Sequence, residues 1–243
     1  MSKGYIIWEG KSKIDGRPIV AIATMKTSNR KTGDMVQIWI LDAEIDPVTS
    51  YKLGLDKSVC GSCTHRGIDG KGRSCYVNLG QAPLSIFKAY KRGVYPRVTD
   101  LLGKKWYQVK RFLTHLFQGK KIRFGAYGDP VLIPRWIVST IVDTAESHTG
   151  YTHQWKRTEF QEYKAFFMAS CDSMIDEVIA KTHGWRRFRV LTEESEKSED
   201  SIECPSDSKG IQCAACTLCK GASIAAKSIW ITAHGSGAKY VTT

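Results

Sequence analysis

The sequence lacks the features that define several common classes of protein. No run of apolar residues approaches the ~18 that a membrane-spanning helix needs, and no apolar segment with a cleavage site follows Met1. The motifs of P-loop NTPases, α/β-hydrolases and zincins are also missing (Gly-x4-Gly-Lys-Ser/Thr, Gly-x-Ser-x-Gly and His-Glu-x2-His). With 42% hydrophobic and 25% charged residues, the composition is that of a folded globular protein. We therefore expect a cytoplasmic protein that does not enter a membrane.

Cysteine, in contrast, is abundant, because the chain of 243 residues contains eight. Thiols stay reduced in the cytoplasm, so clustered cysteines predict metal ligands or redox chemistry rather than disulfides. Seven of the eight fall into two groups, and Cys171 stands alone. The first cysteine group is Cys60, Cys63 and Cys75, and the second cysteine group is Cys204, Cys213, Cys216 and Cys219.

The spacing within both groups is typical of metal sites. A Cys-x2-Cys pair places two thiolates on one tight turn, as a tetrahedral metal ion or one face of an iron-sulfur cluster requires. The second group offers four thiolates, a complete shell for zinc or for a cluster. The first group offers three, which His65 would complete as a zinc site; without His65 a fourth position stays open for solvent or a ligand. Ligands from both groups could also close one merged site.

The charge of the chain is strongly positive and unevenly spread. The formal net charge is +12, and residues 193–207 hold seven acidic residues and one basic residue, which leaves 35 basic and 17 acidic residues elsewhere. Residues 88–123 contain eleven Lys and Arg against Asp100 alone. This segment predicts a polyanionic partner such as nucleic acid, with a merely solubilising surface as the alternative. The candidate contacts are Lys88, Lys91, Arg92, Lys104, Lys105, Lys110 and Arg111.

The order of the predicted elements indicates an α/β fold. Three β-branched and aromatic runs separated by turns predict an N-terminal antiparallel β meander (residues 5–8, 18–22 and 35–41). Helices then alternate with strands. Helices are expected at 104–118, from Pro134, at 160–167 and from Ser173, and strands at 122–127, 150–152, 185–191 and 228–232. Residues 193–210 are expected to form an acidic flexible loop.

This alternation predicts a partial (β/α) barrel or an open, mainly parallel sheet with cysteine-rich metal-binding loops. We expect the meander in residues 1–50 to pack on a metal-binding α/β domain in residues 51–243. In both architectures ligands bind where loops leave the carboxyl ends of the strands. Four candidate cofactor contacts lie at such ends: Gly128, Asp129, His153 and Asp172. His153 beside Trp155 could hold a base or an adenine ring, whereas Asp172 or Ser173 could cap the helix that follows.

The arrangement resembles an uncharacterised bacteriophage gene-product family and, more distantly, the radical S-adenosylmethionine superfamily. The first cysteine group followed by Tyr76 is similar to the cysteines that hold the superfamily's cluster. Gly128-Asp129-Pro130 after a strand resembles its Gly-Gly-Glu-Pro segment, which contacts the amino end of the cofactor. The second cysteine group is similar in position to auxiliary-cluster cysteines. The resemblance covers roughly residues 55–235, and the eleven residues before Cys75 depart from the usual Cys-x3-Cys-x2-Cys spacing.

Two functions follow from these patterns. The first is a phage-type, cysteine-ligated metalloprotein, with zinc or an iron-sulfur cluster, that binds or acts on nucleic acid in the host cytoplasm. The second, implied by the resemblance, is a radical S-adenosylmethionine-like enzyme acting on a nucleotide or nucleic acid, with S-adenosylmethionine as a further cofactor.

Overall fold

The predicted N-terminal meander forms the edge of a larger mixed sheet. The computed structural model describes residues 2–67, 72–102 and 105–241. Strands β1 (Gly4–Lys11), β2 (Pro18–Thr24) and β3 (Val36–Asp42) pair antiparallel in sequence order. β3 then pairs in parallel with β4 (Lys121–Tyr127), and β4 with β5 (Ser147–Thr149). The meander and the α/β part therefore share one hydrogen-bonded sheet, called sheet A, instead of packing as separate layers.

The second sheet, sheet B, is entirely parallel. Its strands lie in the order β6-β7-β8-β10-β9. They are β6 (Tyr151–Thr152), β7 (Met168–Cys171), β8 (Arg187–Leu191), β9 (Ser201–Glu203) and β10 (Ser228–Thr232). Only Gly150 separates β5 from β6, and a Cβ there would lie 2.6 Å from the ring of Phe167. A glycine at this junction thus lets the chain pass from one sheet into the next, and the expected α/β class with parallel strands is confirmed.

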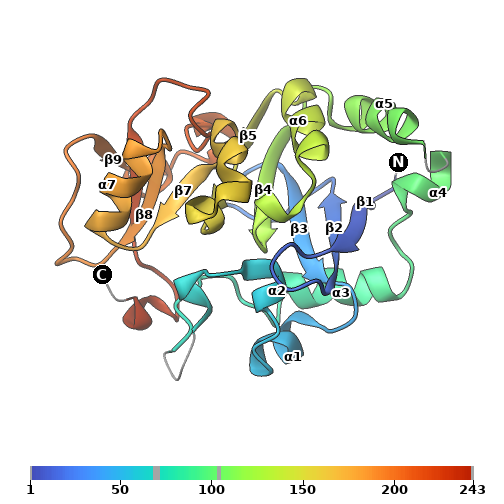
Figure 1. The fold of residues 1–243 in the computed structure, drawn as a ribbon, viewed down its shortest axis with the longest axis horizontal. Coiled ribbons are helices and arrows are strands. Elements are labelled where there is room, and N and C mark those ends of the chain that lie inside the picture. The colour runs from blue at the N-terminus through green and yellow to red at the C-terminus, as the bar shows by residue number, and fades with distance from the viewer. Residues whose placement is uncertain (1, 68–71, 103–104, 242–243) are drawn as a thin grey trace.

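Helices cover sheet A above and below its strands in the view of Figure 1, with α1 to α3 on one side and α5 and α6 on the other. The helices are α1 (Pro47–Lys52), α2 (Lys57–Cys60), α3 (Ala82–Lys91), α4 (Val98–Leu102), α5 (Trp106–Phe117), α6 (Arg135–Thr144), α7 (Met174–Thr182), α8 (Pro205–Ser208) and α9 (Cys213–Cys216). Short 3-10 helices lie at Thr64–Arg66, Pro130–Leu132, Gln154–Lys156, Thr158–Ala165 and Ala238–Tyr240. No helix in the described ranges is long and apolar enough to cross a membrane.

Helix α5 follows the predicted amphipathic pattern. Val109, Leu113 and Leu116 are buried on one side, because apolar residues three or four positions apart share a helix face. Gly119, with φ of 64°, lies just beyond the helix, in the left-handed conformation that glycine adopts without cost. The helix 160–167 is realised as the 3-10 helix Thr158–Ala165, which leads directly into β7.

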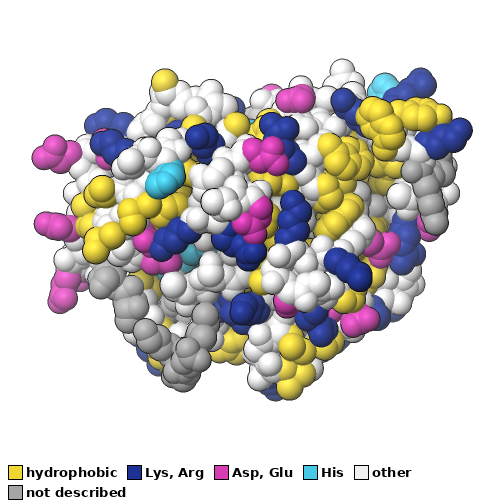
Figure 2. Space-filling model, in the orientation of Figure 1, with side chains coloured by type: hydrophobic (Ala, Val, Ile, Leu, Met, Phe, Trp, Pro, Cys, Tyr) yellow, Lys and Arg dark blue, Asp and Glu magenta, His cyan; other side chains and the backbone are white. Residues whose placement is uncertain are grey.

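Helix α7 exposes its apolar face to solvent. Ile175 and Val178 are 71% and 61% exposed, whereas Asp176 and Glu177 are buried. The buried acids have partners, because Lys156 lies 2.7 Å from Asp176 and an arginine of β8 pairs with Glu177. The helix begins as expected, since the Ser173 hydroxyl accepts from the backbone N–H of Asp176. Figure 2 shows hydrophobic side chains gathered over α7.

The acidic segment 193–210 is more regular than the flexible loop we expect from its composition. It contains β9, which pairs in parallel with β10, and the short helix α8. Asp200 accounts for much of this order, because Arg187 of β8 donates to it and Lys181 of α7 lies 2.8 Å from it. Neutralising partners on two neighbouring elements let an acidic stretch extend the sheet.

Candidate metal centres and the cavity between them

A cavity of about 350 Å³ opens at the carboxyl ends of strands from both sheets. Its walls include the residues directly after β4, β6, β9 and β10, which are Gly128, His153, Cys204 and Ala233. This is the edge at which parallel α/β folds bind ligands. Every member of both cysteine groups lines the cavity, although the groups lie far apart in the sequence.

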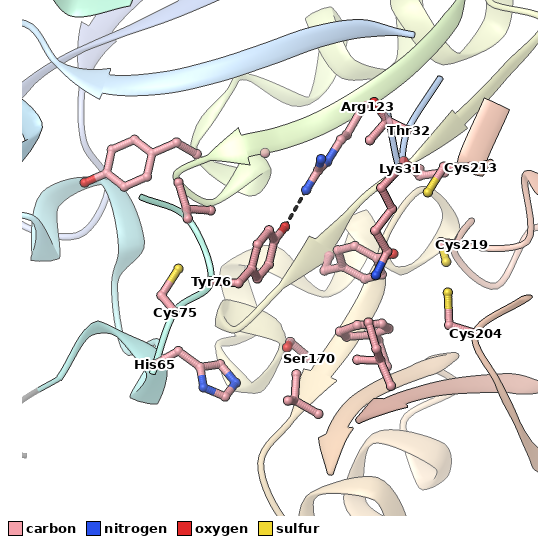
Figure 3. A pocket seen from close by; sticks show the side chains of 18 of the residues that line it. Lys31, Thr32, His65, Cys75, Tyr76, Arg123, Ser170, Cys204, Cys213 and Cys219 are labelled. Carbon is pink, nitrogen blue, oxygen red and sulfur yellow. Dashed lines mark hydrogen bonds between the residues drawn. The ribbon is translucent and has the colours of Figure 1, made fainter. Parts of the chain in front are cut away.

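The two groups approach the cavity from opposite sides. Figure 3 shows Cys75 and His65 on one side, and Cys204, Cys213 and Cys219 on the other. Tyr76 and Arg123 lie between them, with the Arg123 guanidinium donating to the Tyr76 hydroxyl. This arrangement favours two separate centres over one merged site.

The sulfur atoms are spread more widely than one zinc ion requires. Four sulfurs at about 2.3 Å from a tetrahedral zinc ion lie roughly 3.8 Å from one another. Among the described residues, the set of three possible ligands within 4.8 Å of one another is His65, His153 and Asp172, and neither cysteine group supplies such a set. The thiols of either group would therefore have to move closer together to bind one zinc ion.

The first cysteine group is held by buried polar side chains. The Gln154 amide donates to the Cys60 carbonyl at 3.2 Å and accepts from the Ser62 N–H at 3.3 Å. Arg66 forms a buried ion pair with Asp56 at 2.5 Å, which fixes both ends of the turn. Gln154 thus gives the Ser62 N–H an acceptor and the Cys60 carbonyl a second donor besides the Cys63 N–H. The cysteine turn is thereby attached to the carboxyl end of β6.

The second cysteine group is anchored to a loop near the N-terminus. The backbone N–H of Cys213 donates to the Lys31 carbonyl at 3.1 Å, and that of Ala214 to the Thr32 carbonyl at 2.9 Å. Arg186 holds the other end of the group by donating to the carbonyls of Leu218 at 2.8 Å and Lys220 at 2.5 Å, and to those of Ala226 and Lys227. A loop with little regular structure is therefore fixed by backbone contacts to distant parts of the chain.

Burial disfavours the thiolate form of several of the cysteines that line the cavity. It raises the pKa of Cys60 well above its usual value and that of Cys219 to about 12. The pKa of Cys75 is raised for the same reason. Because metals bind the thiolate, loading these sites would release protons.

The carboxylate of Asp129 already accepts hydrogen bonds from four groups of the protein. It accepts from the Thr152 hydroxyl at 2.9 Å and the His153 N–H at 3.0 Å, and from Val131 and Gln154. Burial raises its pKa in spite of these donors. Asp129 therefore ties the end of β4 to the end of β6, a positioning role that the sequence pattern does not reveal. The neighbouring Gly128 borders the cavity and packs on β3, where a Cβ would lie 2.6 Å from the Ile40 carbonyl oxygen.

Two histidines and an aspartate meet beside the first cysteine group. The Nε2 atom of His153 lies 3.4 Å from Asp172 Oδ1 and 3.7 Å from Cys63 Sγ. Burial opposes the charged form of His153, but the Cys63 thiolate and the Asp172 carboxylate outweigh burial and raise its pKa well above the usual value. His65, whose Nε2 lies 3.8 Å from Asp172, differs, because burial and the charge of His153 lower its pKa to about 4. Asp172 itself does not cap α7.

The described candidate contacts for nucleic acid fall on two surfaces, and neither surface lines the cavity. Lys88, Lys91 and Arg92 are exposed on or just after α3, while Lys105, Lys110 and Arg111 are exposed on or just before α5. Figure 1 shows these helices well apart. Lys104 lies outside the described residues. The α5 surface also exposes Trp106 and Tyr107, which the sequence pattern assigned to the helix without singling them out as contacts.

Comparison with known proteins returns no family model, no curated protein and no solved structure that matches the chain.

Proposed function

We propose that this protein is a cytoplasmic, cysteine-ligated metalloprotein, of the phage type that its sequence resembles, that acts on a nucleotide or nucleic-acid substrate between two metal centres. One observation carries the proposal: both cysteine groups line the same cavity, from opposite sides, at the carboxyl ends of parallel strands. Closed structural metal sites have no need to share a cavity, whereas centres that act on one substrate do.

Iron-sulfur clusters are the centres that the number of thiols in each group and the sequence resemblance support. The first group supplies three thiolates and leaves one position open, as an enzyme needs if its cluster is to bind a ligand. The second group supplies four and can close a cluster. Clusters so placed would supply electrons to a molecule in the cavity, and S-adenosylmethionine is the cofactor that the sequence resemblance implies.

The side chains between the centres suit an aromatic, anionic ligand. Arg123 and Lys31 bring positive charge into the cavity wall, and Tyr76, Tyr151 and Phe188 bring aromatic rings. Guanidinium groups bind phosphate through paired N–H donors, and aromatic faces stack on bases. A nucleotide, free or at the end of a strand, has both chemical features.

Anaerobic purification followed by metal and sulfide analysis tests this proposal. We expect a coloured protein with iron and inorganic sulfide, and about half of both should be lost in Cys75→Ser and in Cys216→Ser. Cys171→Ala is the matched control, because this buried cysteine does not line the cavity and its loss should leave the iron content unchanged. A colourless protein that contains only zinc would contradict the proposed enzymatic function and would favour a zinc-stabilised binding protein.

The α5 surface supports a second candidate function, binding of single-stranded nucleic acid. Trp106 is 64% exposed and Tyr107 52% exposed, and Lys110 and Arg111 lie one helical turn away. Figure 2 shows hydrophobic and basic side chains together over this helix. Exposed aromatic side chains next to cations are the combination that stacks bases and neutralises phosphates.

A charge-matched comparison tests this second candidate. The triple change of Lys105, Lys110 and Arg111 to Glu should weaken binding of a single-stranded oligonucleotide and flatten its salt dependence, with little change in Tm. The control triple places Glu at Lys26, Lys52 and Lys209, which are exposed elsewhere, so the net charge of both variants is the same. Equal affinity of the two triple variants would show that only net charge matters.

A further inference from the structure

The three residues beside the first cysteine group form a donor set that contains no cysteine. His65 follows Cys63 on the 3-10 helix Thr64–Arg66, His153 follows β6, and Asp172 follows β7. One nitrogen from each histidine and one carboxylate oxygen all lie within 4.8 Å of one another. Their convergence comes from the fold, since the sequence separates them widely.

The distances within this set match a single metal ion. Zinc binds histidine nitrogen and carboxylate oxygen at about 2.1 Å, so neighbouring ligand atoms in a tetrahedral shell lie roughly 3.4 Å apart. Asp172 Oδ1 is 3.4 Å from the Nε2 of His153 and 3.8 Å from the Nε2 of His65. An ion placed among the three atoms would need only small shifts of the His65 ring.

The carboxylate oxygen at the centre of the set has no other partner. Asp172 Oδ1 is inaccessible to solvent and accepts no hydrogen bond from the described residues. A carboxylate oxygen hidden from water in this way needs a positive charge beside it, which a protonated His153 supplies without metal and which a bound cation would supply in its place. Both histidine Nε2 atoms face it, so a bound cation would satisfy all three groups at once.

The surroundings also orient the rings as a metal site requires. His65 Nδ1 lies 2.8 Å from the Ser74 hydroxyl, and a proton on Nδ1 leaves the lone pair of Nε2 directed to Asp172. The backbone N–H of His153 is fixed by Asp129 at 3.0 Å. Both histidines line the cavity, which gives an ion a route of entry.

We propose that His65, His153 and Asp172 bind one divalent metal ion of the zinc class, with a remaining coordination position open to the cavity. Two histidines and one carboxylate suit zinc or ferrous iron, and sites with three protein ligands keep a position for water or a substrate oxygen. A phosphate oxygen is the natural occupant if the substrate is a nucleotide. Cys63, 3.7 Å from His153, marks the border with the cysteine-ligated centre.

Metal titration of the purified protein, with its cysteine-bound centres in place, tests this site. In calorimetric titrations the wild type should bind one more equivalent of Zn²⁺ than His153→Ala or Asp172→Asn. Ser74→Ala, which leaves the ligands intact, should weaken that equivalent about 10- to 100-fold, because such outer contacts orient the ligand. His234→Ala is the matched control, a histidine of the same cavity outside the set. Equal stoichiometry in wild type and both ligand variants would overturn the proposal.

Co²⁺ separates this inference from the proposed cysteine-ligated centres. Cobalt bound by thiolate shows an intense sulfur-to-metal charge-transfer band, whereas cobalt bound only by nitrogen and oxygen does not. The cobalt equivalent that Asp172→Asn fails to bind should lack this band. Cys75→Ser should still bind that equivalent unchanged. If the cobalt equivalent that Asp172→Asn fails to bind carries the thiolate band, the three residues are part of the first cysteine centre and the separate site is refuted. The same conclusion follows if Asp172→Asn loses cysteine-bound iron together with that equivalent. If iron is absent but this equivalent binds, the site stands and the cluster proposal fails.

Discussion

The side-chain amide of Gln154 donates to the backbone carbonyl of Cys60 at 3.2 Å. Gln154 is 1% exposed, and its oxygen accepts from the N–H and the hydroxyl of Ser62. One buried side chain thus spans the turn between the first two cysteines and joins it to the end of β6. The order of the first cysteine group depends on this contact.

Gln154→Leu should therefore weaken the first centre selectively. Leucine keeps most of the volume but leaves the Ser62 N–H without its acceptor and removes one of the two donors to the Cys60 carbonyl, at a cost of about 1–3 kcal/mol. Chemical denaturation and metal analysis should show lower stability and metal missing from the first group alone. Gln118→Leu on the surface is the control. Full metal content in Gln154→Leu would contradict the assigned role.

Gly61→Ala should be more harmful than Gly16→Ala, although both glycines have positive φ (58° and 79°). A positive φ costs an L-residue at least about 1–2 kcal/mol at either position. At Gly61 the added Cβ would also lie 2.4 Å from the Gln154 amide, whereas nothing lies within 4 Å at Gly16. The amide would have to move and lose its buried hydrogen bonds, so Gly61→Ala should cost roughly 1–3 kcal/mol more. Similar Tm values for the two variants would argue against this close approach.

Arg186→Lys should release the second cysteine loop while leaving the first centre loaded. The planar guanidinium donates to four carbonyls of residues 218–227, and an ammonium group cannot match that geometry. We expect the free energy of unfolding to fall by several kcal/mol and the second group to lose its metal. The metal content of Arg186→Lys in a Cys75→Ser background reports on the second group. Arg135→Lys, at an exposed pair with Glu162, should behave as wild type.

His148 should make the protein sensitive to mild acid. Burial lowers its pKa to about 4, and its Nε2 lies 2.8 Å from the Phe166 carbonyl. The unfolded chain takes up this proton near pH ~6.5 and the folded protein only near its lowered pKa, so stability is complete above pH ~6.5 and falls as the pH drops below that value. The shift corresponds to roughly 3 kcal/mol.

His148→Gln should flatten this dependence, because glutamine keeps a donor for Phe166 but does not titrate. Free energies of unfolding measured at about pH 7 and about pH 4.5 should differ less in the variant than in wild type. His115→Gln, exposed on α5, should leave the wild-type slope. If His148→Gln shows an undiminished slope, other groups control acid unfolding.

The sequence predicts the local elements and the α/β class well, because hydrophobic periodicity dominates both. The runs at 5–8, 18–22 and 35–41 become β1 to β3, and the helix ending before Gly119 becomes α5. β9 is missed, because its ion pairs with Lys181 and Arg187 come from distant elements. Composition alone cannot show that such partners exist.

The candidate site is only partly visible in the sequence. Cysteine spacing identifies two groups, but that they face one cavity depends on how sheets A and B meet. Asp129 lies in a segment that resembles a superfamily motif, yet it serves as a buried acceptor for Thr152 and His153. Nothing in the local sequence shows that His65, His153 and Asp172 converge, since each histidine alone resembles an ordinary one. Long-range pairing decides all of these.

The attachment of the second cysteine group to the loop near Lys31 also determines when the cavity can be completed. Gln212, next to Cys213, donates to the carbonyl of Arg30, 182 positions earlier in the chain. During synthesis the early strands can fold long before their partner loop leaves the ribosome. Any metal that the proposed second centre binds would then be loaded late, after residues 213–219 have left the ribosome.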